Sequence, residues 1–264
     1  MAVNDKTHPN QSVQVFNKIA EELIPNGFTL TENKRILFYE GTSKSIPIAR
    51  YTNMAQLVHI LSGEMSFSKR LLFSDRTELG DYLDPRLIVI NQVTGIGGRR
   101  RNEYIKRKRE KYKSTLNFYA SCWTMKEHES FMMWKAYSPT DSGVMVTSTL
   151  SGLIEHLVIP DDAFLICGPA VYYREEKEKT AYMEILFSKN IAYQEESEYR
   201  FYLISDNFRP NHKYIFLRQS CITSIVFSPL FGENNCIEHA TKLMKLFGDD
   251  VQWLFHPSSL LESR

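Results

Sequence analysis

Cysteine is scarce in this chain of 264 residues: its four cysteines lie far apart and form no Cys-x-x-Cys pair. That spacing argues against a disulfide framework and against a zinc ribbon, and it is typical of a protein from a reducing cytosol. The seven histidines are scattered in the same way, so the sequence predicts no metal site.

Long apolar runs are also missing. No stretch approaches the roughly 18 apolar residues that a membrane span needs. The first residues, MAVNDKTHPNQSVQ, do not place a basic region before an apolar one, so we expect no secretory signal. Together these absences predict a cytoplasmic protein that does not enter a membrane.

Net charge is nearly zero, because 32 Lys and Arg residues stand against 31 Asp and Glu residues, for a formal charge of +1. This balance excludes a uniformly basic nucleic-acid coat protein. With 43% hydrophobic and 24% charged residues, the composition is that of a folded globular protein and excludes disordered, collagen-like and low-complexity classes.

One segment breaks the charge balance. Residues 99–113, RRRNEYIKRKREKYK, hold nine Lys or Arg and two Glu, a local charge of +7 that leaves −6 for the rest of the chain. Because glycines precede this run, we expect a basic helical insertion at 95–115. It is either a solvated helix or a surface where the cations bind phosphates and Tyr104 and Tyr112 stack on unpaired bases. The candidate nucleic-acid-binding residues are Arg99, Arg100, Arg101, Lys106, Arg107, Lys108, Arg109, Lys111 and Lys113.

Hydrophobic spacing predicts an α+β protein, because helices and strands interleave irregularly without a GxGxxG unit or a P-loop. We expect an N-terminal helical and extended segment at 1–44 and a single α+β domain at 45–264. The expected helices cover 11–24, 53–63, 126–137, 175–187 and 235–247. The expected strands cover 36–39, 46–51, 116–124, 143–148, 163–167, 171–173, 199–204, 214–217, 222–227 and 251–255.

The densest polar cluster is Glu195-Glu196-Ser197-Glu198-Tyr199-Arg200. If a strand begins near Glu196, the side chains of Glu196, Glu198 and Arg200 share one face. Two carboxylates and a guanidinium on one face can position a sugar and stabilise developing positive charge. The alternative is a solvated strand edge with a cross-strand ion pair, which is the commoner outcome for such a pattern.

Two further candidates follow from residue type. Trp134 and Tyr137 lie three residues apart, so on a helix they would share a face that could stack on a planar ligand such as nicotinamide or a base. The alternative for both is packing in the helix core. Arg50 ends an apolar strand, where it would either bind a phosphate or cap a neighbouring carboxylate.

The order and spacing of five motifs resemble a bacterial family known as domain of unknown function 2971. The motifs are Arg50-Tyr51-Thr52, Phe73-Ser74-Asp75-Arg76-Thr77-Glu78, Ser121-Cys122-Trp123-Thr124, Met133-Trp134-Lys135-Ala136-Tyr137 with Gly143, and Tyr193-Gln194-Glu195-Glu196-Ser197-Glu198-Tyr199-Arg200. The resemblance covers roughly residues 45–230. Tyr193, Trp123 and Arg76-Thr77 replace the family's usual tryptophan, phenylalanine and Pro-Phe, and the basic insertion lies outside the family's short form.

That family in turn looks like a remote relative of ADP-ribosyltransferases, which implies a split antiparallel or mixed β-sheet flanked by helices and NAD as substrate. The resemblance implies that Glu198 bonds the ribose 2′-hydroxyl and that Glu196 orients or deprotonates the acceptor. The implied NAD-binding residues are Arg50 at the pyrophosphate, Tyr51, Ser121 at the pocket, and Trp134 or Tyr137 on nicotinamide. It further implies a bacterial toxin or phage-defence effector that modifies nucleic acid, RNA before DNA, or protein. Such a toxin would have an antitoxin partner and a chaperone, and it needs no metal.

Two other functions stay open at this point. The chain could be a non-catalytic nucleic-acid-binding module in which Glu196, Glu198 and Arg200 form a structural ion network. It could also be a nuclease that uses Asp75, Glu78 and Glu198 with a divalent ion, although nothing in their spacing enforces this.

Overall fold

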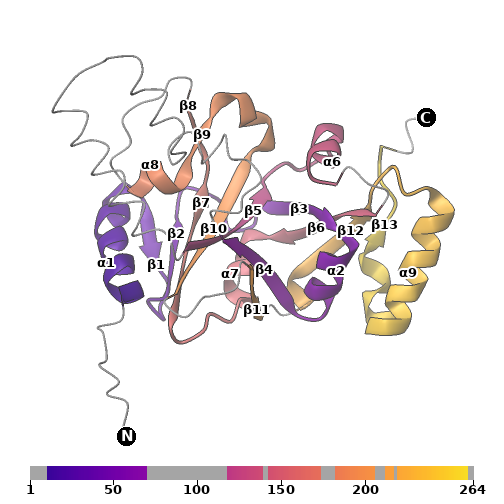
Figure 1. Ribbon diagram of the computed structural model, residues 1–264, viewed down its shortest axis with the longest axis horizontal. Helices are drawn as coiled ribbons and strands as arrows, with labels where there is room; N and C mark the ends of the chain where they lie inside the picture. The colour runs from indigo at the N-terminus through magenta and orange to yellow at the C-terminus, as the bar shows by residue number, and fades with distance from the viewer. Residues whose placement is uncertain are drawn as a thin grey trace, which may run out of the picture.

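The protein is a mixed α+β structure in which helices flank a large mixed sheet, as the sequence predicts (Figure 1). The computed structural model describes residues 11–69, 118–138, 142–173, 182–205, 212–216 and 219–260. The basic run 99–113, with its nine candidate residues, and the candidates Asp75 and Glu78 lie outside the described residues. In the described part of the chain, no helix combines the length and the apolar character that crossing a bilayer requires.

Eleven of the described strands form the main sheet, in the order β1-β2-β7-β10-β5-β3-β6-β12-β13; β4 branches from β5 and pairs with β11. Most pairs are antiparallel, but β2 runs parallel to β7 and β12 runs parallel to β13. The first strands are β1 (Phe28–Leu30), β2 (Ile36–Tyr39), β3 (Pro47–Asn53), β4 (Glu64–Lys69), β5 (Phe118–Thr124) and β6 (Gly143–Thr149). The others are β7 (Ala163–Pro169), β10 (Glu198–Ser205), β11 (His212–Phe216), β12 (Ile222–Phe227) and β13 (Phe255–His256). Strands β8 (Val171–Tyr173) and β9 (Ser188–Asn190) form a separate parallel pair.

The sheet forks along one edge of β5. Strand β3 meets β5 at Ala49 and Thr124, whereas β4 meets it at the other end, where Ser68 pairs with Ala120. Among the described strands, none pairs with residues 121–123 on this edge. Helix α2 (Met54–Leu61) connects the two arms of the fork. Its first turn is capped by the Asn53 side chain, which accepts a hydrogen bond from the backbone N–H of Gln56 at 3.0 Å.

Helices cover both faces of the sheet. One face packs against α2, α7 (Leu150–His156) and α9 (Glu233–Phe247), which contribute Leu57, Leu153 and Leu243 to the largest apolar cluster. The other face packs against α1 (Gln11–Leu23) and α8 (Tyr182–Phe187) over one half, and against α6 (Phe131–Tyr137) over the other. The candidate site lies on this second face, between α8 and α6.

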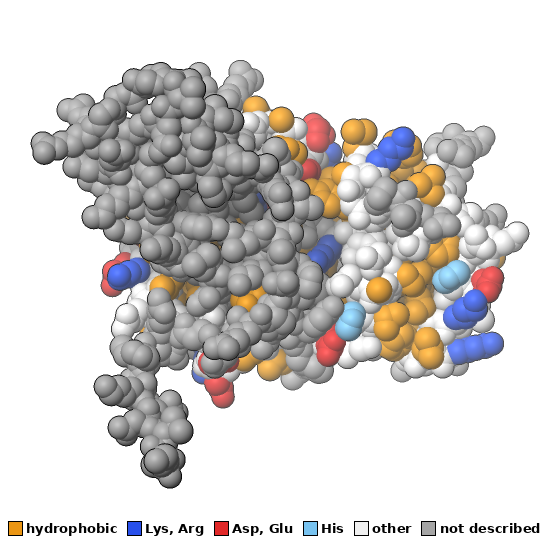
Figure 2. All heavy atoms as spheres, viewed as in Figure 1, with side chains coloured by type: hydrophobic (Ala, Val, Ile, Leu, Met, Phe, Trp, Pro, Cys, Tyr) orange, Lys and Arg blue, Asp and Glu red, His pale blue; other side chains and the backbone are white. Residues whose placement is uncertain are grey.

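The surface over α2 and α9 mixes hydrophobic and charged side chains, as the right half of Figure 2 shows. Ile237 and Leu246 of α9 are 60% and 73% exposed, and Lys242 pairs with Glu238 one turn away. Isolated exposed apolar residues of this kind are common on soluble folds and indicate no particular function.

Two sequence-based boundaries are corrected by the structure. The helix expected at 126–137 begins only at Phe131, because the Ser130 hydroxyl caps it by accepting from the backbone N–H of Met133 at 3.4 Å. The strand expected at 251–255 is wrong, since residues Asp249–Leu254 form the 3₁₀ helix η5 and only Phe255–His256 joins the sheet. The described residues also form the 3₁₀ helices η1 (Ile24–Asn26), η3 (Ile191–Glu196) and η4 (Gln219–Cys221).

Candidate functional site

The Glu-rich motif folds as a turn into a strand. Residues Ile191–Glu196 form η3, and the Asn190 side chain caps it by accepting from the backbone N–H of Ala192 at 2.9 Å. Ser197 then adopts a left-handed conformation with φ of 44°, and β10 begins at Glu198. The condition that the strand begins near Glu196 is therefore not met, whereas the strand predicted at 199–204 is present as β10. Glu196 and Glu198 do not alternate along one strand, yet the turn brings both carboxylates to the same place.

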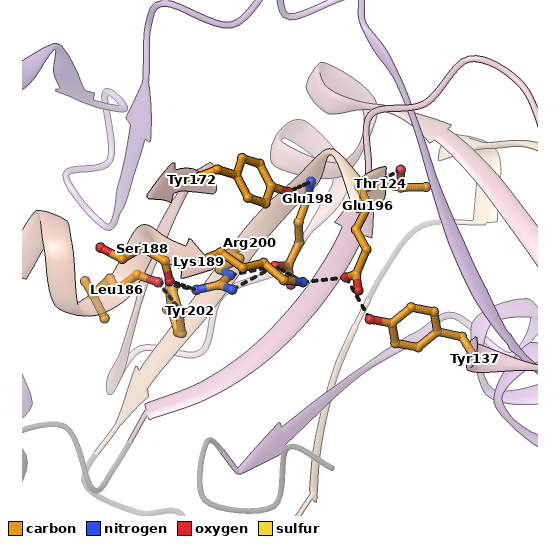
Figure 3. A network of polar contacts seen from close by, with 10 residues as sticks. All are labelled: Thr124, Tyr137, Tyr172, Leu186, Ser188, Lys189, Glu196, Glu198, Arg200 and Tyr202. Carbon is orange, nitrogen blue, oxygen red and sulfur yellow. Dashed lines mark hydrogen bonds and ion pairs between the residues drawn. The ribbon is translucent and has the colours of Figure 1, made fainter. Parts of the chain in front are cut away.

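Glu198 is a buried carboxylate that accepts hydrogen bonds from three nitrogen atoms of two cationic side chains. Its Oε2 accepts from Nε and Nη2 of Arg200 at 2.9 and 2.8 Å and from Nζ of Lys189 at 3.1 Å (Figure 3). Burial alone would raise the pKa of this carboxyl, but the positive charges of Arg200 and Lys189 outweigh burial and lower the pKa to about 2. Glu198 is therefore ionised throughout the physiological pH range.

Glu196 lies next to Glu198 and nearer to the surface. Its Oε2 accepts a short hydrogen bond from Nζ of Lys189 and another from the hydroxyl of Tyr137 at 2.7 Å. The Glu196 side chain is 16% exposed, whereas that of Glu198 is 8% exposed and that of Lys189 is fully buried. Figure 3 shows the Lys189 ammonium between the two carboxylates, with Tyr137 approaching from the side of α6.

Arg200 fixes this cluster to the end of α8. Its Nη1 donates at 2.9 Å to the backbone carbonyl of Leu186, in the last turn of α8, and at 3.3 Å to that of Ser188, the first residue of β9. The last carbonyls of a helix have no partner within the helix, so the bond to Leu186 satisfies one of them. The hydroxyl of Tyr202 donates to the same Leu186 carbonyl at 2.5 Å.

The positive charges of Lys189 and Arg200 balance the negative charges of Glu196 and Glu198, so the net charge of these four side chains is zero. We refer to these four residues as the ion network.

Two neutral side chains complete the surroundings of Glu198. The hydroxyl of Tyr172 on β8 accepts from the backbone N–H of Glu198 at 2.8 Å. Cys122 on β5 pairs with Arg200 in the strand register, and its thiol hydrogen-bonds to Glu198. Burial, and then the negative charge of Glu198, raise the pKa of the Cys122 thiol well above its ordinary value, so the thiol stays protonated.

Arg50 and Ser121 form a second group at the fork in the sheet. Nη1 of Arg50 on β3 donates to Oγ of Ser121 on β5 at 2.7 Å, and the Trp123 indole donates to the same oxygen at 3.2 Å. Because neighbouring residues of a strand point to opposite faces, Ser121 and Cys122 lie on opposite sides of β5. The structure therefore places the predicted residues in two groups, one on each side of this strand.

Trp134 and Tyr51 lie in the core rather than on an open surface. Their rings meet edge to face with centroids 4.8 Å apart, and the residues are 1% and 8% exposed. The indole of Trp134 donates to Oε2 of Glu129 at 3.0 Å, and the hydroxyl of Tyr51 accepts from the backbone N–H of Ser130 at 2.9 Å. Trp134 and Tyr137 do not offer one open stacking surface, because Trp134 is buried and only Tyr137, at 45%, is exposed.

The sequence interpretation did not include Lys189 or Cys122 as functional residues. Lys189 stands alone in a mostly apolar stretch, and nothing in its immediate neighbours indicates that it is buried. Its two carboxylate partners lie seven and nine residues later, beyond the turn of η3. Within the described residues, no group of three or more His, Cys, Asp or Glu side chains is arranged to hold a metal ion.

Comparison of the chain with protein-family models, with curated proteins and with solved structures finds no significant match.

Proposed function

We propose that the protein is an NAD-dependent ADP-ribosyltransferase. The observation that carries the proposal is the pair of carboxylates, Glu196 and Glu198, which Lys189 holds together. The contact between Arg50 and Ser121 lies on the opposite side of β5, beside the edge where none of the described strands pairs with residues 121–123. Strands β3, β5 and β10 are consecutive in the sheet, although Arg50, Ser121 and Glu198 are far apart in the chain. The order of Arg50, Ser121 and Glu198 in the chain is the order that the family resemblance implies, and it supports the proposal.

The proposed reaction breaks the bond between C1′ of the ribose and the nicotinamide nitrogen. The bonding electrons leave with nicotinamide, and positive charge develops on C1′ and the ring oxygen. An acceptor nucleophile then forms the new bond to C1′ and releases one proton. An ionised carboxylate close to the ribose stabilises the charged transition state more than the neutral ground state of the sugar.

The residues support separate roles in this reaction. Glu198 is ionised and held by three cationic hydrogen bonds, so it suits the ribose 2′-hydroxyl and the developing charge. Glu196 is more exposed and suits the acceptor side, where it would orient the nucleophile or take its proton. Arg50 supplies a guanidinium for the pyrophosphate, and Tyr137 is the exposed one of the two aromatic candidates for nicotinamide.

The acceptor in this proposal is nucleic acid, RNA before DNA, with protein as the other possibility. The proposal rests on the +7 charge of residues 99–113, which would attract a phosphate backbone. By analogy with the implied family, the protein would be a cytoplasmic toxin or phage-defence effector with an antitoxin and a chaperone as partners.

The test is release of nicotinamide from NAD with cellular RNA and protein supplied as acceptors. Wild type should release nicotinamide, Glu198→Gln should lose this activity, and Glu196→Gln should keep hydrolysis of NAD but transfer less ADP-ribose to the acceptor. Circular dichroism verifies that each variant is folded. Absence of nicotinamide release from folded wild type with either acceptor would refute the proposal.

A second candidate function is a non-catalytic nucleic-acid-binding module. The observation that favours it is the ion network itself. Two cations and two carboxylates with low solvent exposure neutralise each other, which is what a network with a purely structural role would do. Such a module would not consume NAD. Its affinity for RNA should fall, and depend less on salt, when Lys106, Arg107, Lys108, Arg109, Lys111 and Lys113 are replaced by glutamine.

A further inference from the structure

We propose that Lys189 is a positioning residue that holds the carboxylates of Glu196 and Glu198 in the geometry needed for ADP-ribose transfer. This inference rests on the proposed function and adds a residue to it. Lys189 contacts both carboxylates, and the chemistry of each carboxylate depends on where the ammonium places it.

The position of Lys189 is fixed from several sides. It belongs to β9, which pairs with β8 so that Lys189 lies opposite Tyr172 in the register. Its Nζ lies 5.2 Å from the ring centroid of Tyr193 on η3, within the range of a cation–π contact. Lysine is among the most flexible side chains, yet this one is fully buried and therefore has little freedom. A rigid ammonium can hold the two acids that contact it.

A buried ammonium is expensive unless its contacts compensate for the lost water. Glu198 already has two hydrogen bonds from Arg200, so neutralising Glu198 alone does not require a second cation. What Lys189 adds is a link from Glu198 to Glu196, which belongs to a different element. Without this ammonium, two like charges would face each other and repel.

Loss of Lys189 should therefore disturb the chemistry more than the binding of NAD. Glu198 and Glu196 would stay in the sequence but lose their common anchor, and small misplacements of catalytic groups reduce rates strongly. Arg50 and Ser121 lie on the other side of β5 and keep their contact. We expect kcat for nicotinamide release to fall about 10- to 100-fold in Lys189→Met, with KM for NAD within about twofold of wild type.

The matched control is Lys126→Met. Lys126 pairs with Glu195 at 2.8 Å, in the same Glu-rich motif, but Glu195 is 90% exposed and belongs to neither proposed catalytic group. This variant removes the same charge next to the same motif and should leave kcat unchanged. Lys189→Arg keeps a cation at the buried position and should recover part of the kcat that Lys189→Met loses.

A second pair of variants covers the case in which Lys189→Met does not fold. Glu196→Gln alone and Glu196→Gln with Lys189→Met are compared, because the double variant leaves Arg200 and Glu198 as a neutral pair. In this background NAD hydrolysis reports on Glu198 alone, and the link to Glu196 no longer exists. Lys189 still donates to Glu198 at 3.1 Å, so its loss should lower kcat by less than the roughly 10- to 100-fold expected of Lys189→Met alone, with KM unchanged.

The outcomes separate the two proposals. If wild type turns over NAD and folded Lys189 variants keep their kcat, or if KM alone changes, the positioning role is refuted while the transferase function stands. If Lys126→Met lowers kcat as much as Lys189→Met, the loss of kcat comes from removing a positive charge anywhere near the motif, and the positioning role is refuted as well. If wild type does not release nicotinamide, both proposals fail together.

Discussion

Removing the Glu198 carboxylate should destabilise the fold strongly, because it leaves an excess positive charge in a buried place. Lys189 and Arg200 are 0% and 3% exposed at their side chains, and in Glu198→Gln only Glu196 stays to balance them. Removing one partner of a buried ion pair lowers the free energy of unfolding by about 3–5 kcal/mol. Since a domain's whole stability is about 5–15 kcal/mol, this is a large fraction of the total.

The charge balance allows a sharper version of the same prediction. Lys189→Met removes one cation and should also destabilise the protein by roughly 3 kcal/mol. The double variant Lys189→Met/Glu198→Gln leaves Arg200 with Glu196, and its charges are balanced again. We expect its loss of unfolding free energy to be smaller than the sum of the two single losses by about 1–3 kcal/mol.

The assay is urea unfolding followed by far-UV circular dichroism at 25 °C and pH 7, with the four proteins of the cycle compared at equal concentration. The control cycle uses Lys126→Met and Glu195→Gln, which form an exposed pair and should leave the urea midpoint unchanged. A stabilising role of the ion network is refuted if the losses of unfolding free energy in the buried cycle are strictly additive, or if the single variants lose no more than those of the control cycle.

Three other predictions concern separate parts of the structure. The pKa of Glu198 is lowered from 4.5 to about 2, so the contribution of its carboxylate to stability is complete above about pH 4.5 and disappears as the pH falls toward 2. As the pH is lowered from 7 to 3, the urea midpoint of Glu198→Gln should therefore fall less steeply than that of wild type. Equal slopes would contradict this. Glu129→Gln should cost about 2 kcal/mol by urea unfolding, because Oε2 accepts from Trp134 and Ser258 and Oε1 accepts from Ser259, whereas an amide has only one acceptor oxygen and loses one of these two sets of donors. An unchanged midpoint would contradict it. Arg50→Lys should raise KM for NAD at nearly constant stability, because a lysine cannot bind a phosphate with two parallel hydrogen bonds, and an unchanged KM would remove Arg50 from the proposed site.

Much of the fold could be predicted because buried strands and helices carry regular apolar patterns. The strand expected at 199–204 is β10 with one more residue at each end, and all its residues are buried. The helix expected at 235–247 is α9, which begins two residues earlier. These elements form where the sequence repeat and the packing agree, so the local pattern is sufficient to find them.

The errors arose where two periods fit the same residues. Val251 and Leu254 are each 2% exposed and lie three residues apart, which is the repeat of the 3₁₀ helix η5. The apolar residues from 251 to 255 also fit the repeat of a short strand, so the sequence alone does not distinguish the two structures. Similarly, the polar residues before Phe131 fit a helix, but the Ser130 cap starts it later.

The candidate site could be predicted only in part, because its geometry depends on contacts between distant segments. The contact between Arg50 and Ser121 joins residues 71 positions apart, and no local pattern in the sequence predicts it. Burial of Lys189 has no local signal either. It arises because η3 folds Glu196 back over the ammonium while β10 brings Glu198 to its other side.

The division of roles between the two carboxylates follows from the physics of the ion network. A carboxylate with a pKa of about 2 is a very weak base, so Glu198 cannot take a proton from an acceptor at neutral pH with useful efficiency. The same three hydrogen bonds that make it a weak base keep it ionised and rigid, which is what stabilising a positive transition state requires. Proton transfer then falls to Glu196, the more exposed carboxylate, which also contacts the exposed Tyr137. In the proposed reaction Glu198 therefore acts on the sugar and Glu196 on the acceptor, and the proposed role of Lys189 is to keep the two carboxylates at a constant separation.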